Sequence, residues 1–94
     1  MATYAILYWQ NLPSLVEAKD DDATHKIQLS QAFQALIDNV AMQKGLLGSD
    51  AYLEEWTRGE SLQRDGSAEE VAKAVADELE AQFPEIMAAA TKGD

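Results

Sequence analysis

The sequence predicts a single domain of the α+β class, with one small sheet and two helices packed on it. An apolar, aromatic segment over residues 2–9 has the pattern of a buried strand, and two later segments repeat apolar residues with the period of a helix. The length of 94 residues suits one domain with one core. We therefore expect two to four strands in the order β-β-α-(β-β)-α within residues 1–84, followed by a partly helical or frayed tail over residues 85–94.

The first strand is predicted over residues 2–9. Apolar side chains occupy both alternating sets of positions there, which is typical of a strand covered on both faces. Residues 11–14 have the composition of a turn, because Pro13 fixes its own φ and disfavours a helical conformation at Leu12. We expect the first strand to end at this turn.

A second strand is expected over residues 15–19, followed by a solvated acidic loop over residues 20–22. Residues 24–28 leave two alternatives open. His25 and Ile27 alternate as in a strand, whereas Ile27 also suits the position that precedes a helix.

The first helix is predicted from about residue 30 to residue 44. Its apolar positions form one helical stripe, made of Leu29, Phe33, Leu36, Ile37, Val40 and Ala41. Ser30 is placed to cap the N-terminus, Lys44 suits the negative end of the helix dipole, and Gly45 can adopt the left-handed conformation that ends a helix.

Residues 51–65 are expected to form a hairpin. Aromatic residues return over residues 51–57, residues 57–60 have turn composition, and residues 61–65 are long enough to pair back. A short helix over residues 51–57 is the alternative.

The second helix is predicted to begin at a capping box formed by residues 67–70, in which Ser67 and Glu70 cap each other's backbone N–H groups. Its buried stripe is expected to contain Val71, Ala74, Val75, Leu79 and Phe83. Pro84 should end or kink this helix, and the terminus around Gly93 should fray.

The composition excludes several classes of function. Seventeen acidic against seven basic residues give a formal charge of −10, which opposes binding to nucleic acid and to anionic membranes. The longest apolar run, residues 4–9, is far shorter than the ~20 residues of a membrane helix. The chain has no cysteine, so disulfides and thiolate chemistry are excluded and a reducing, cytoplasmic location fits best.

No catalytic constellation, cofactor motif or metal-ligand set is found, so we assign no catalytic residue, cofactor or metal site. The single histidine, His25, lies close after Asp20, Asp21 and Asp22, and these residues would be the ligands or the acid–base groups of a metal- or small-ligand-binding protein or enzyme. A solvated histidine beside an acidic loop is the simpler interpretation.

The seven aromatic residues are the remaining signal. Trp9 and Trp56 each lie at the end of an expected strand, and with Tyr52 and Arg58 they are the candidate partner-binding residues, because tryptophan and arginine are enriched in interface hot spots. The alternative is that both tryptophans close the ends of the core.

Three groups of residues carry a resemblance to a known family. They are Tyr8-Trp9 with Leu12-Pro13-Ser14; Gln28-Leu29-Ser30 with Phe33, Ile37-Asp38 and Ala41-Met42; and Asp50-Ala51-Tyr52-Leu53-Glu54 with Trp56 and Gly59. In these the chain resembles the small bacterial "virulence factor" domain family. The resemblance implies a compact, cytoplasmic, stand-alone bacterial domain, and it implies no established activity, cofactor or substrate.

These observations lead to three hypotheses about function. The first is a small non-catalytic accessory or adaptor protein, which binds a larger protein through the aromatic patch and whose acidic surface suits a partner with a basic surface. The second is the ligand- or metal-binding protein that uses His25. The third is a homo-oligomer formed through a sheet edge or the second helix.

Overall fold

The fold is α+β, with one antiparallel sheet and four helices, in a computed structural model that describes residues 1–91. The strands are β1 (Ala2–Trp9), β2 (Leu12–Lys19), β3 (Thr24–Gln28), β4 (Trp56–Arg58) and β5 (Leu62–Arg64). The helices are α1 (Gln31–Gln43), α2 (Asp50–Glu54), α3 (Ala68–Ala81) and α4 (Phe83–Thr91). The predicted class is therefore confirmed, whereas the number of strands and the order of the elements differ from the prediction.

The sheet is built around the long hairpin of β1 and β2, and its order is β3-β2-β1-β4, with β5 also paired to β1. Because β4 and β5 pair with the same side of β1, they form two parts of one outer strand. Tyr4 lies opposite Leu62 and Leu7 opposite Arg58, so the outer strand has one residue more than β1 over this stretch. The outer strand therefore has a β-bulge between Arg58 and Leu62, and Gly59 is part of this bulge.

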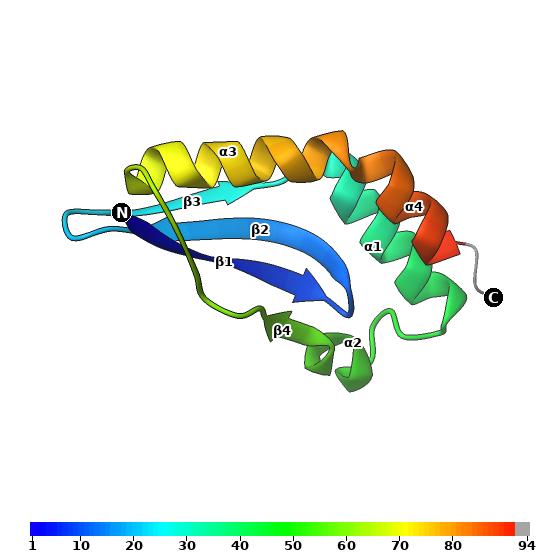
Figure 1. Ribbon diagram of the computed structural model, residues 1–94. Helices are drawn as coiled ribbons and strands as arrows, with labels where there is room; N and C mark the ends of the chain where they lie inside the picture. Colours follow the sequence, from blue (N-terminus) through cyan, green and yellow to red (C-terminus); the bar gives the residue numbers. More distant parts are fainter. Residues whose placement is uncertain (92–94) are drawn as a thin grey trace.

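Helix α3 lies along one face of the sheet, while α1 and α4 lie together at the end of the sheet that carries the β1–β2 turn (Figure 1). We call this end the hairpin end. The sheet residues packed against α3 include Ala2, Val16 and Ala18, which are buried with Val71, Ala72 and Val75 of the helix. Arg64 of β5 forms a bidentate ion pair with Glu78 of α3, at 2.6 and 3.1 Å, and so joins the outer strand to the helix.

A second core cluster fills the hairpin end. There Trp9 and Leu12 pack with Leu36, Ile37, Val40 and Ala41 of α1. Helix α4 contacts both clusters through Phe83 and Ile86. The ring of Phe83 meets Phe33 of α1 edge-on, with the ring centroids 4.9 Å apart. The expected fraying around Gly93 concerns residues outside the described part of the chain.

The hairpin expected over residues 51–65 is wrong, and the alternative of a short helix is correct for its first part. Residues 50–54 form helix α2, because the Ser49 hydroxyl accepts the backbone N–H of Tyr52 and caps it. The short strands β4 and β5 follow, and each pairs with β1 instead of with the other. The aromatic composition of residues 51–57 favoured a strand, whereas the N-cap at Ser49 stabilises a helix.

The first turn is also shorter than predicted. It consists of Gln10 and Asn11, with Gln10 at φ 56°, and β2 already begins at Leu12. Pro13 lies within the strand beside a register shift, where the ladder is interrupted and a proline is tolerated. The open question over residues 24–28 is resolved as strand β3, which pairs with β2.

The helix ends follow the sequence closely. Gly45 has a φ of 70° after the last turn of α1, as its position predicted. The Ser67–Glu70 capping box is present at the start of α3, and Pro84 lies where α3 gives way to α4. Within residues 1–91, no helix combines the length and hydropathy of a membrane-spanning segment.

Candidate functional site

The predicted aromatic residues do come together at the hairpin end. Tyr52 of α2 lies between the two tryptophans, with its ring centroid 5.4 Å from Trp9 and 6.2 Å from Trp56. The indole Nε1 of Trp9 donates a hydrogen bond to the Tyr52 carbonyl at 2.9 Å. This bond fixes α2 against the end of β1.

The three rings differ in exposure. Trp9 is 0 % exposed, which fits the alternative that it closes the core. Trp56 and Tyr52 are half-buried, so each keeps surface that a partner could contact. Trp9, Tyr52 and Trp56 therefore form a mostly buried aromatic cluster, and Trp56 is its partly exposed member on β4.

Arg58 lies two residues beyond Trp56, on the same side of β4. Its guanidinium Nη1 donates to the carboxylate of Glu17 on β2. Lys26 of β3 approaches the other oxygen of the same carboxylate at 3.7 Å. The three charged side chains therefore cross the sheet from its outer strand to β3.

These charges belong to the sheet face opposite α3, which we call the open face. Its members follow from the strand register, since paired residues share a face: Thr3, Ala5, Leu7, Leu15, Glu17, Lys19, Thr24, Lys26, Gln28, Arg58 and Gln63. Over residues 1–91, neither core cluster contains Ala5, Leu7 or Leu15. Residues 2–9 were expected to be covered on both faces; on this face Ala5 is buried, whereas Leu7 is only partly buried.

The open face differs in charge from the rest of the chain. It carries three of the seven basic residues, Lys19, Lys26 and Arg58. Of the seventeen acidic residues it carries one, Glu17. In a chain with a formal charge of −10, this face has a local excess of positive charge.

Two hollows in the open face meet at Glu17 and Arg58. The larger, of ≈ 450 Å³, is mainly polar in its lining residues: Thr3, Tyr4, Glu17, Lys19, Thr24, Arg58 and Ser61. The smaller, of ≈ 260 Å³, adds the apolar side chains of Ala5, Leu7 and Leu15, together with Lys26. A polar and an apolar depression therefore lie next to each other.

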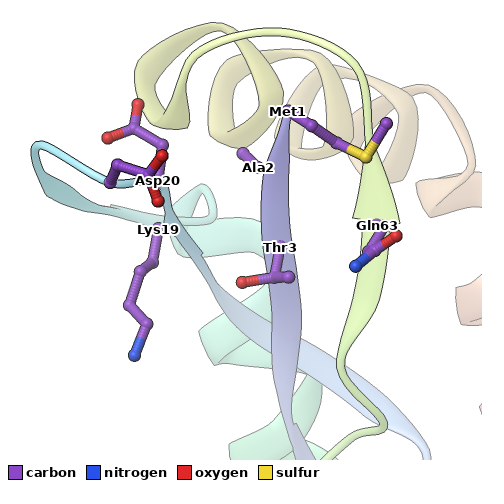
Figure 2. A pocket seen from close by; sticks show the side chains of 7 residues that line it. Met1, Ala2, Thr3, Lys19, Asp20 and Gln63 are labelled. Carbon is purple, nitrogen blue, oxygen red and sulfur yellow. The ribbon is translucent and has the colours of Figure 1, made fainter.

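A third hollow of ≈ 260 Å³ lies at the end of the strands near the N-terminus. Figure 2 shows Thr3, Lys19 and Gln63 there on three neighbouring strands, with the Lys19 side chain directed away from α3. Thr3 and Lys19 also line the larger hollow, so the polar surface continues to this end of the sheet.

Glu17 is ionised in this setting. The hydrogen bond from Arg58 lowers the pKa of its carboxyl group below the usual value, against a smaller opposing effect of desolvation. Its two oxygens face two cations, Arg58 and Lys26, so this carboxylate links the outer strand to β3.

The hypothesis of a metal site requires His25 and the acidic loop to direct their side chains toward one point. His25 is half-buried and lies opposite Ala18, so its side chain is on the α3 side of the sheet. The carboxylate of Asp20 accepts the backbone N–H groups of Asp22, Ala23 and Ala68. These bonds engage Asp20 in the structure of the turn and of α3.

The open face is not among the sites predicted from the sequence. Arg58 and Trp56 were predicted as candidates, but Glu17, Lys19 and Lys26, which the strand pairing places on the same side of the sheet, were not. The alternation of Glu17 and Lys19 with Val16 and Ala18 was the available signal, because polar residues at every second position indicate an uncovered face.

Comparison with known proteins identifies a family. A family model described as "Virulence factor" matches residues 7–88, which is most of the chain and includes β2, β3, α1, α2, α3 and the outer strand. No curated protein and no solved structure matches the chain.

Proposed function

Because the chain belongs to the Virulence factor family, whose name describes a phenotype and no molecular activity, we propose that it is a non-catalytic accessory or adaptor domain that binds a larger protein through its open face. One observation carries the proposal. Leu7 and Leu15 are partly exposed on a sheet face and belong to neither core cluster of residues 1–91, and cationic side chains border them. Apolar centres with polar rims are the usual anatomy of protein interfaces.

The open face suits a partner whose contact surface is acidic. The negative charge of the whole chain favours a basic partner at long range, but the groups in contact act over short distances. At physiological ionic strength, charges farther apart than about 8 Å are largely screened. Lys19, Lys26 and Arg58 lie within the face itself, so they determine which charges it attracts at contact.

Two further features support recognition by this face. Arg58 and Lys26 are 60 % and 62 % exposed in their side chains, so a partner can reach both. Trp56 borders the face on the same side of β4 as Arg58 and adds aromatic surface. The exposed part of the aromatic patch is therefore one border of a larger surface.

The test is affinity capture from a lysate of the source cells, followed by mapping of the contact. The immobilised baits are the wild type, Arg58→Glu, and Lys73→Glu as a matched control. Lys73 is exposed on α3, so the control makes the same change of charge away from the open face. Amide shifts of the ¹⁵N-labelled chain with the purified captured protein then locate the contact.

We expect one protein that the wild type and Lys73→Glu retain and that Arg58→Glu binds at least about 10-fold more weakly. Its amide shifts should follow β1, β2 and β3 on the open face, and its contact segment should be acidic. The proposal fails if no protein is retained, if Arg58→Glu binds as well as the wild type, or if the shifts follow α1 and α4. It also fails if the free chain is a dimer joined through the open face.

A further inference from the structure

Glu17 occupies the centre of the cationic surface. It is the one acidic residue among the open-face positions given by the strand register. Its side chain is 20 % exposed, whereas the side chains of Arg58 and Lys26 on either side of it are 60 % and 62 % exposed. The carboxylate is therefore held below the level of the two cations.

Arg58 has binding capacity left after pairing with Glu17. A guanidinium carries five N–H donors, and Glu17 takes a hydrogen bond from Nη1. Within residues 1–91, no other hydrogen bond of the Arg58 side chain is found. Guanidinium groups bind carboxylates through two parallel N–H donors, so the free edge of Arg58 is suited to a second carboxylate.

The larger hollow lies beside Arg58 and is lined by further donors. Lys19 contributes an ammonium group, and Thr3, Thr24 and Ser61 contribute hydroxyl groups. Glu17 is the one acidic residue of this lining. The lining of this hollow of ≈ 450 Å³ thus combines two cationic residues with residues that carry hydroxyl groups, and the apolar depression of Leu7 and Leu15 lies next to it.

We propose that this hollow is a subsite for a carboxylate side chain of the partner, bound by Arg58 and Lys19, with an apolar partner residue on Leu7 and Leu15 beside it. This inference rests on the proposed function and makes it specific. Glu17 has two roles. It holds Arg58 in place, and its charge opposes the incoming carboxylate, so it weakens binding and limits it to partners that also fill the apolar depression.

The probe is an acetylated, amidated pentapeptide of sequence Ser-Leu-Ser-Glu-Ser, in which the leucine and the glutamate lie on one side when the peptide is extended. The matched peptide has glutamine in place of glutamate. Both are titrated into the ¹⁵N-labelled chain, and inorganic phosphate is titrated separately. The variants are Arg58→Gln, Glu17→Gln and Lys73→Gln as a control.

We expect the glutamate peptide to bind at least about 10-fold more tightly than the glutamine peptide, with shifts at Thr3, Lys19 and Thr24. Arg58→Gln should abolish this difference, and Lys73→Gln should preserve it. Glu17→Gln keeps an acceptor for Arg58 and removes the opposing charge, so it should tighten binding of the glutamate peptide several-fold.

Equal binding of the two peptides would overturn the inference, as would shifts outside the hollow or unchanged affinity in Glu17→Gln. Tighter binding of phosphate than of the glutamate peptide would overturn it too, because the hollow would then serve a free oxyanion. These failures are distinguishable from failure of the proposed function. A captured partner that is lost in Arg58→Glu would leave the open face as the docking surface even if the peptides bind alike.

Discussion

Asp20 of the β2–β3 turn accepts the backbone N–H of Ala68 at 2.8 Å and so caps helix α3 from 48 residues away in the chain. Its other carboxylate oxygen accepts the N–H groups of Asp22 and Ala23. Ser67 and Glu70 cap each other at the same helix end. One carboxylate therefore joins the turn to the helix that covers the sheet.

Replacing Asp20 by alanine should destabilise the fold, because the Ala68 N–H and the turn N–H groups lose their acceptor. We expect a fall in the thermal midpoint on the order of 5 °C, measured by circular dichroism at pH 7. Asp21→Ala is the control, since Asp21 is an exposed neighbour in the same turn. Equal midpoints for the two variants would contradict the role of Asp20.

The contribution of Asp20 should also depend on pH. The hydrogen bond from Ala68 is the main cause that lowers the pKa of this carboxyl group, followed by those from Asp22 and Ala23. A lowered pKa stabilises the folded state fully above the unfolded value of about 3.9, and this stabilisation is lost as the pH falls through the folded pKa. The midpoint difference between wild type and Asp20→Ala should be constant from pH 7 to pH 5 and shrink below pH 4. A difference that grows in acid would refute this assignment.

Glu80 of α3 has a similar role at the start of α1. Its carboxylate accepts the backbone N–H of Ser30 at 2.6 Å and the Ser30 hydroxyl at 2.9 Å. We expect Glu80→Ala to destabilise the protein by about 1 kcal/mol, because both bonds are charge-assisted but lie at the surface. Urea unfolding measures this loss. Asp77→Ala, an exposed change on the same helix, should have a smaller effect, and an equal effect would argue against the cap.

The sequence predicted well those features that neighbouring residues determine. The capping box of Ser67 and Glu70 and the left-handed Gly45 involve contacts within four residues, so their chemistry is visible in the sequence. Ser30 was placed correctly at the helix start, but its hydroxyl donates to Glu80 and caps nothing in α1. A partner 50 residues away cannot be found from local spacing.

Which charged residues meet on the open face could not be predicted for the same reason. Glu17 meets Arg58 only because β1 pairs with β2 on one side and with β4 on the other. Lys26 joins them only once residues 24–28 are strand and not the approach to a helix. Each of these pairings joins residues far apart in the chain, so Arg58 could be predicted as a candidate from its type and position, but its neighbours could not.

Gly59 should not tolerate a side chain. A Cβ at this position would lie 2.9 Å from Cε2 of the Tyr8 ring and 3.1 Å from the Ile6 carbonyl oxygen. The Gly59 N–H donates to that same carbonyl at 2.8 Å, so the backbone cannot move away without losing the bond. We expect Gly59→Ala to destabilise the protein by about 1–3 kcal/mol in urea unfolding, as overpacking usually does.

Ser61→Ala is the control for Gly59, because Ser61 is exposed in the same connection between β4 and β5. Its stability should stay near that of the wild type. A Gly59→Ala variant as stable as the control would show that the outer strand can shift, and the bulge would then not fix the position of Arg58.

Trp9 should contribute more to the stability of the fold than Trp56, and Trp56 should be more accessible to solvent. In Trp9→Phe the Tyr52 carbonyl loses its 2.9 Å hydrogen bond and the core loses volume, so we expect a cost of about 1–3 kcal/mol in urea unfolding. Trp56→Phe should cost less, because Trp56 is half-buried and no hydrogen bond from its indole N–H is found within residues 1–91.

The variants Trp9→Phe and Trp56→Phe each keep one tryptophan, so quenching of its fluorescence by acrylamide compares the exposure of the two residues directly. Weak quenching of Trp9 and stronger quenching of Trp56 are expected, and the reverse order would remove Trp56 from the border of the open face.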